Sequence, residues 1–344
     1  MEGLLSESGP YRITQFSSPP TLTFNNFTWN SKANNLFFES PAGVGFSYCE
    51  DASGCDNTDT NTAASSLLVL QSFYAAFPEF RANPLWLTGE SYAGVYIPMF
   101  AYNVFHYNVA NPSTPLNLKG IMVGNGCIGN SAGHCGNDKL NDYHDIVTFR
   151  GHGLISQALF DACIKECDWD FPSLACDALL LEASLLTAGL DIYDLYNTCS
   201  DPASTPPKRL RAPVGNRTAI ARRLGAAAAP AARMRLDATA APDPNCFGSG
   251  PTIEAWANQP AVKAALHVAP AIDFELCSGN FSFNYNSDMR DEREVIYPTL
   301  LTQANITVLI FNGEADLCVP FTDNECTSLA CGGAGGAARQ RHLY

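Results

Sequence analysis

Residues 84–94 read Pro-Leu-Trp-Leu-Thr-Gly-Glu-Ser-Tyr-Ala-Gly. The apolar run before Gly89 predicts a short buried strand, after which the chain turns sharply at Ser91 between small residues. Such a turn lifts the Ser91 hydroxyl above the sheet, and a helix predicted from Tyr92 to about Phe105 points its N-terminus at the same place. The motif favours Ser91 as a nucleophile that attacks a carbonyl carbon. A Gly-Ser turn in an ordinary strand–helix unit is the alternative.

Longer motifs carry a resemblance to a known family. In chain order they are 35–48 (NLFFESPAGVGFSY), 89–98 (GESYAGVYIP), 120–126 (GIMVGNG) and 312–320 (NGEADLCVP). Together they resemble the serine carboxypeptidases, the group of the wheat and yeast enzymes and cathepsin A. The resemblance leaves out the segment 203–243 and about the last dozen residues. It implies an α/β-hydrolase fold, in which a doubly wound, mostly parallel sheet carries an inserted, disulfide-rich, largely helical cap subdomain.

The apolar patterning predicts strands at 34–39, 85–88, 119–123 and 306–311, and a helix at 59–77 capped by Thr60 or Asn61. Strands that alternate with helices indicate a parallel, doubly wound sheet.

The stretch between the last two of these strands is too long for a simple crossover. We therefore expect a first part of the hydrolase core at 1–125, a cap subdomain at 126–289, and a second, incomplete part of the core at 290–344. Within the cap, the segment 203–243 is rich in Ala, Arg and Pro and is expected to be a disordered linker. The resemblance places an excised or variable linker there, so cleavage in this segment is a hypothesis.

The charge is strongly acidic and unevenly placed. The formal net charge is −14, and 8 of the 20 basic residues lie between 203 and 243. This balance argues against nucleic acid as a partner, and an acidic body suits an acidic compartment. No run of 18 apolar residues predicts a membrane span. No cofactor or metal is expected, because no cysteine pair has the CxxC spacing of a zinc site.

Thirteen cysteines favour an oxidising compartment. Cys49 with Cys55, and Cys127 with Cys135, are expected to close small loops, and the odd count leaves at least one thiol free or paired outside the chain. Four glycosylation sequons support the same compartment; they begin at Asn26, Asn216, Asn280 and Asn305. The predicted location is the secretory pathway, with the vacuole or lysosome or the extracellular space as its end.

Asp316 is the expected acid of a catalytic triad, because it follows the strand 306–311 in a Gly-x-x-Asp turn. A carboxylate that only caps this turn is the alternative. The backbone N–H of Tyr92 is the expected oxyanion donor. In α/β-hydrolases the triad residues follow the chain order Ser, Asp, His, and His342 is the only histidine of this sequence after Asp316. Its surroundings are those of a C-terminal tail, so we expect the catalytic histidine to lie outside this chain. The family's upstream glycine-rich turn and a signal peptide are also missing, which a protein truncated at both ends would explain.

Glu90 and Glu7 match family glutamates that, by resemblance, bind the substrate's C-terminal carboxylate while protonated. Two close carboxyls can share a proton, which would favour binding at acidic pH. A helix N-terminal acid is the alternative for Glu90. The sequence thus predicts a serine-type carboxypeptidase that acts on peptide and protein C-termini through an acyl-enzyme. An acyltransferase or esterase on the same scaffold, or a catalytically inactive fragment, remains open. A homodimer is also left open.

Overall fold

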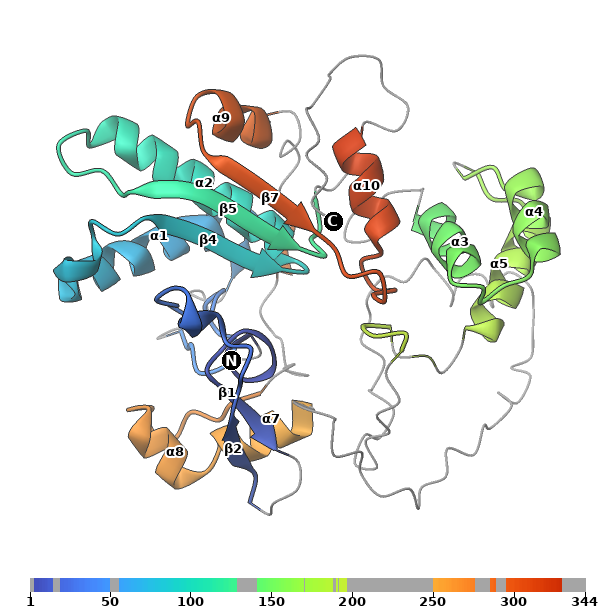
Figure 1. Cartoon of the computed structure of the whole chain (residues 1–344). Coiled ribbons are helices and arrows are strands. Elements are labelled where there is room, and N and C mark those ends of the chain that lie inside the picture. The colour runs from blue at the N-terminus through green and yellow to red at the C-terminus, as the bar shows by residue number, and fades with distance from the viewer. Residues whose placement is uncertain are drawn as a thin grey trace. The chain divides into compact units, whose positions relative to one another are not determined.

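The computed structural model describes residues 3–14, 19–49, 56–128, 141–169, 171–187, 190, 192–196, 250–275, 285–288 and 295–329 (Figure 1). The described chain falls into two compact units. The first unit comprises residues 3–65 and 250–287, and the second comprises residues 66–196 and 288–329. The division predicted from the sequence, with boundaries after 125 and 289, stays a prediction.

The second unit is built on a three-stranded parallel sheet of order β4-β5-β7. Its strands are β4 (Leu85–Glu90), β5 (Leu118–Gly124) and β7 (Thr307–Phe311). The ladder pairs Glu90 with Gly124, and Gly124 with Phe311, so all three strands end level with one another. Figure 1 shows the three arrowheads at one edge of the sheet. Three of the four predicted strands, and their parallel order, are therefore confirmed.

Helices next to this sheet form its apolar core. They are α1 (Asp59–Ala76), which leads to the short turn η4 (Pro78–Phe80), α2 (Ala93–Ala110) and α9 (Tyr297–Thr302). One buried cluster joins side chains of these helices to the sheet; it includes Tyr74, Val104, Leu300, Leu87 and Ile121.

The start of α1 differs from the predicted cap. The Thr58 hydroxyl accepts a hydrogen bond from the Asn61 N–H at 3.2 Å, and the Asn61 Oδ1 accepts one from the Thr58 N–H at 2.6 Å. This reciprocal arrangement is a capping box, which satisfies two amides of the first turn. Thr58 is therefore the cap, with Asn61 as its partner, and Thr60 is not.

A second apolar cluster in the same unit is entirely helical. It is formed by α3 (Asn141–Gly151), α4 (Gln157–Glu166) and α5 (Leu174–Leu186), which lie together in Figure 1. A disulfide between Cys167 and Cys176 joins the end of α4 to the start of α5. The helix α10 (Phe321–Leu329) follows β7 and packs against α3. This helical, disulfide-bonded part agrees with the predicted cap.

The first unit has a small core of its own around Leu5, Ile13, Ile253 and Phe274. Its N-terminal part holds η1 (Gly3–Glu7), the antiparallel strands β1 (Tyr11–Thr14) and β2 (Thr21–Phe24), and η2 (Trp29–Ser31). Its later part holds α7 (Gly250–Ala257) and α8 (Pro260–Ala265). The short strands β3 (Asn57–Thr58) and β6 (Tyr285–Asn286) pair in parallel.

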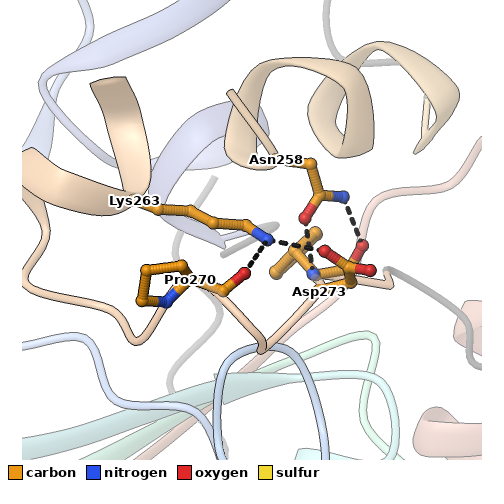
Figure 2. Close-up of polar contacts among 5 residues, drawn as sticks. Asn258, Lys263, Pro270 and Asp273 are labelled. Carbon is orange, nitrogen blue, oxygen red and sulfur yellow. Dashed lines mark hydrogen bonds and ion pairs between the residues drawn. The ribbon is translucent and has the colours of Figure 1, made fainter. Parts of the chain in front are cut away.

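Polar contacts fasten the loop after α8 to the helices of the first unit (Figure 2). The buried Lys263 donates from Nζ to the Asp273 carboxylate at 2.6 Å and to the Pro270 carbonyl at 3.4 Å. The Asn258 side chain bonds both backbone groups of Phe274, each at 2.8 Å. These contacts hold Phe274 in the apolar core, so they serve the fold.

The strand predicted at 34–39 is wrong. These residues form no ladder, and Leu36, Phe37 and Phe38 are 45%, 38% and 38% exposed rather than buried. An apolar run becomes a strand only where a neighbouring strand pairs with it. Among the described residues no strand pairs with this run.

Several sequence predictions fall outside the described residues: Cys55, Cys135, the segment 203–243, Asn216, Asn280 and His342. Cys49 and Cys127, whose expected partners are in this group, are both disulfide-bonded. None of the helices described by the structure has the length and apolar character needed to cross a bilayer.

Candidate active site

Ser91 sits in a strained turn between β4 and α2. Its φ of +58° lies in the left-handed region, which a residue with a side chain seldom adopts. Three backbone hydrogen bonds hold it there. The Ser91 N–H donates to the Gly124 carbonyl at 3.1 Å, and the Ser91 carbonyl accepts from Gly94 at 2.8 Å and from Cys127 at 2.9 Å. Because strain of this kind persists only where the surroundings enforce it, the turn matches the predicted nucleophile position.

The small residues beside Ser91 are required by close packing. A Cβ added at Gly89 would lie 2.6 Å from the Ala93 Cβ and 2.7 Å from the Ile97 Cγ1. A Cβ at Gly94 would lie 2.5 Å from the backbone nitrogen of Cys127. The strand, the helix and the segment after β5 therefore approach too closely for any larger side chain.

The helix α2 begins directly after the serine. Tyr92 occupies its N-cap position with φ −60° and ψ −17°, and its carbonyl accepts the Val95 N–H at 3.0 Å. The positive end of the helix dipole is thus next to Ser91, where it would favour negative charge on a substrate oxygen. The role of the Tyr92 N–H as an oxyanion donor stays a prediction.

Asp316 lies in the loop between β7 and α10. Its Oδ1 accepts hydrogen bonds from the Cys318 N–H at 2.7 Å and the Val319 N–H at 3.3 Å. The carboxylate therefore does cap its own turn, as the alternative proposed. Fixing one carboxylate oxygen in this way also orients the group, which is what a triad acid requires.

Asn125 ties the loop of Asp316 to the end of β5. Its Oδ1 accepts from the Gly313 N–H at 2.7 Å, and its Nδ2 donates to the carbonyls of Gly313 at 3.1 Å and Val319 at 3.2 Å. The preceding residue, Gly124, accepts the Ser91 N–H. Asn125 therefore connects the two loops that carry the predicted catalytic residues.

Cys318 lies two residues after Asp316, and acidic groups influence the pKa of its thiol. Burial raises the pKa of its thiol to about 11; the Asp316 carboxylate adds to this, and a hydrogen bond with Tyr193 opposes it. Glu90 and Asp145 raise it further. The charges of Glu90 at the end of β4 and of Asp145 on α3 therefore influence the same thiol as the Asp316 carboxylate does.

The two glutamates expected to bind a carboxylate are in different units. Glu90 belongs to the second unit and is exposed at the end of β4. Glu7 is exposed at the end of η1 in the first unit, where its carbonyl accepts from the Asn25 side chain at 3.2 Å. The pairing of their carboxyl groups stays a prediction.

The described histidines have contacts of their own. His144 is buried on α3, with Nε2 3.5 Å from the Asp323 Oδ1, and the His152 Nδ1 is 3.3 Å from the Tyr196 hydroxyl. The His106 ring packs on Tyr102, and His267 belongs to the first unit. Within the described part of the chain, no histidine is hydrogen-bonded to the Ser91 hydroxyl. In the same part, no group of three His, Cys, Asp or Glu side chains could hold a metal ion.

Ser91 and Asp316 were predicted from sequence patterns and stay predictions, whereas Asn125, Cys318 and Asp145 were not singled out. For Asn125 a signal was available, because a polar residue that directly follows a parallel strand points to the edge where sites form. Asp145 gave no such signal, since it lies on a helix far from the motifs in sequence.

Comparison with known proteins gives consistent results. A family model described as serine carboxypeptidase matches residues 1–339. Serine carboxypeptidase-like 20 of Arabidopsis thaliana is 31% identical over 96% of this chain and 69% of its own length. The lysosomal protective protein of Mus musculus is 33% identical over 94% of this chain and 67% of its own length.

A solved structure shares the fold. It is Kex1(Delta)p, a prohormone-processing carboxypeptidase from Saccharomyces cerevisiae, with a TM-score of 0.64 and 21% identity over 95% of this chain. At 21% identity the match is evidence for the fold alone, and it confirms the predicted α/β-hydrolase fold. The chain spans 65% of the yeast protein, so it covers about two thirds of the length of these relatives.

Proposed function

The chain belongs to the serine carboxypeptidase family, and we propose that its site releases C-terminal residues from peptides and proteins through an acyl-enzyme. The observation that carries the proposal is the backbone of Ser91, which is held at φ +58° between β4 and the N-terminus of α2. This turn is the form in which an α/β-hydrolase presents its nucleophile.

In the proposed reaction, the Ser91 Oγ attacks the carbonyl carbon of the last peptide bond. The carbonyl oxygen becomes an oxyanion, which the Tyr92 N–H and the positive end of α2 stabilise. A histidine takes the serine proton and passes it to the leaving amine, and Asp316 orients that histidine. His342 is the histidine of this sequence that follows Asp316 in chain order, so its substitution tests whether it is the base.

Preference for a free C-terminus is proposed to come from the carboxyl groups near Ser91. The charges of Glu90, Asp145 and Asp316 all raise the pKa of the Cys318 thiol. A substrate carboxylate would be repelled by an ionised carboxylate near Ser91, but it could accept a hydrogen bond from a protonated one. Activity is therefore expected to rise at acidic pH, with Glu90 and Glu7 as the groups that bind the carboxylate.

The proposed location is the secretory pathway, ending in a vacuole, a lysosome or the extracellular space. The Cys167–Cys176 disulfide and the similarity to a lysosomal protein support it. The homodimer stays a prediction, which sedimentation of the purified protein would test.

The function is tested with a blocked dipeptide that has a free C-terminal carboxylate and with the C-terminal amide of the same dipeptide. We expect cleavage of the free acid at acidic pH, a much lower rate on the amide, and no cleavage by Ser91→Ala. Glu90→Gln should raise KM for the acid more than for the amide. Equal rates on both substrates would contradict recognition of the carboxylate, and cleavage by Ser91→Ala would exclude Ser91 as the nucleophile.

A further inference from the structure

A tight turn follows β2 and presents two residues to solvent. The Thr28 N–H donates to the Asn25 carbonyl at 3.2 Å, and the Phe27 N–H donates to the Asn25 Oδ1 at 3.0 Å. The Asn25 Nδ2 donates to the Gly9 carbonyl at 2.8 Å, which anchors the turn to the chain beside it. Asn26 and Phe27 are therefore the two central residues of a fixed turn, and both are exposed.

This turn coincides with one of the four sequons, Asn26-Phe27-Thr28. Asn25 holds the turn through its own side chain, whereas Asn26 is exposed to solvent. The Thr28 hydroxyl is buried and 3.2 Å from the Ser8 carbonyl. An enzyme that reads Thr28 must therefore act before this turn has folded.

An aromatic surface lies next to Asn26 and is unusually open to solvent. Phe24 is 64% exposed, Tyr11 is 48% exposed, and their ring centroids are 6.2 Å apart in an edge-to-face arrangement. The two residues are directly opposite each other in the β1–β2 ladder. Phe27, in the turn itself, is 85% exposed. Exposed aromatic side chains of this kind often mark a surface that another group contacts.

We propose that Asn26 carries an N-linked glycan whose first sugar packs against Phe24. The Asn26 and Phe24 Cα atoms are two residues apart, at most about 7 Å, which is within reach of the first sugar. The C–H face of N-acetylglucosamine is apolar, and an aromatic ring is its natural partner. The occupant is thus covalently placed beside the surface that it covers.

The modification is a group transfer from a lipid-pyrophosphate-linked oligosaccharide of the secretory pathway. The Asn26 Nδ2 forms a bond to C1 of the first N-acetylglucosamine, and the bond from C1 to the pyrophosphate oxygen breaks. The amide nitrogen loses one proton, and the lipid pyrophosphate leaves. No oxidant or reductant takes part.

The site is tested on protein secreted from a eukaryotic cell behind a signal sequence. Trypsin cuts after Arg12 and Lys32, so the peptide 13–32 contains this sequon and no other. Peptide N-glycosidase converts a glycosylated Asn to Asp, and fragment-ion mass spectrometry distinguishes position 26 from position 25. We expect Asp at position 26 in most copies, and loss of one glycan from the intact mass in Asn26→Gln. Recovery of the peptide from secreted protein with Asn26 unmodified would overturn the proposal.

The packing on Phe24 is tested separately by thermal melting before and after removal of the glycan under native conditions. We expect removal to lower the melting temperature by about 2 °C in the unmutated protein, and by much less in Phe24→Ser. Asn305→Gln is the matched control, since Asn305 is exposed and begins a sequon with no aromatic residue two positions before it. Equal shifts in the unmutated protein and Phe24→Ser would overturn the packing, while the mass measurement would still decide the site. Neither measurement depends on peptidase activity.

Discussion

At the scale of single residues, the strained Ser91 and the crowded glycines beside it form one arrangement. Ser91 is held at a φ of +58° by two backbone contacts. Its N–H donates to Gly124, the last residue of β5, and its C=O accepts from Cys127, three residues further along. The residues that follow β5 can approach the start of α2 this closely only because Gly94 has no side chain. The position of Ser91, the proposed nucleophile, therefore depends on a residue with no side chain of its own.

Replacing Gly94 by Ala should destabilise the protein and displace Ser91. The added Cβ would lie 2.5 Å from the Cys127 nitrogen, and backbone atoms cannot rotate away. We expect a loss of about 1–3 kcal/mol in the free energy of unfolding, measured by urea denaturation, with loss of Ser91 reactivity. Gly151→Ala is the control, because nothing lies within 4 Å of its Cβ position. Equal effects of the two substitutions would contradict the argument from crowding.

The Cys318 thiol should make stability fall at alkaline pH. Its pKa is raised to about 11 in the folded protein, against 9.0 ordinarily, so the folded state holds this proton more tightly. Its contribution is therefore complete below pH 9 and is lost as the pH rises toward 11. We expect the fall in the urea midpoint across this range to be smaller in Cys318→Ala.

Cys163 serves as the comparison for this measurement, because burial raises its pKa to about 11 as well. Cys163→Ala should reduce the alkaline fall, and the double variant should reduce it further. A Cys318→Ala variant that follows the unmutated protein at every pH would show that this thiol is not buried among acidic groups.

At the scale of elements, sequence patterns predicted what local periodicity controls. The strands β4, β5 and β7 and the helices α1 and α2 were all predicted, because each has an apolar run or a helical spacing of its own. The run at 34–39 failed because a strand also needs a partner, which its own residues do not reveal. Asn125 was missed for a similar reason, since its partners Gly313 and Val319 lie almost two hundred positions further along the chain, at separations of 188 and 194 residues.

Asn125→Ala should loosen the connection between the two loops that carry the proposed catalytic residues, Ser91 and Asp316. It removes three hydrogen bonds between the end of β5 and the loop of Asp316. We expect a loss of about 1–3 kcal/mol in the free energy of unfolding and a larger fall in kcat than in stability. The fall in kcat should appear at a temperature where the variant is fully folded.

Asn117→Ala is the matched control at the other end of β5. Its side chain also bonds a loop backbone, donating to the Ala82 carbonyl at 2.9 Å, but far along the strand from Ser91. It should cost stability with little change in kcat. If Asn117→Ala lowers kcat as much as Asn125→Ala, the connecting role of Asn125 is wrong.

At the scale of the whole molecule, the chain forms two units whose sequence segments are interleaved. The first unit joins residues 3–65 to residues 250–287, and both parts contribute to its core, for example Ile13 and Ile253. Neither composition nor periodicity predicts such a joining, because it depends on tertiary packing alone. The acidic charge of the chain, by contrast, is read directly from the sequence.

The net charge of −14 should make stability depend on salt and on pH. Carboxylates that repel one another at neutral pH are screened by salt, and near the sequence pI of about 4.7 they are partly neutralised. We expect added sodium chloride to raise the melting temperature at pH 7 and to have a smaller effect near pH 5. A salt effect of equal size at both pH values would show that general repulsion is not the cause.

The most direct test of the account is covalent labelling of Ser91 by a fluorophosphonate probe, located by peptide mass spectrometry. The probe reacts with a serine only where the hydroxyl is activated and an oxyanion can be stabilised. We expect a label on the peptide that contains Ser91, absent in Ser91→Ala and reduced in Asp316→Asn. Label on another serine of the folded protein would contradict the assignment of Ser91 as the nucleophile, and no label at all would show that no base of this chain reaches Ser91.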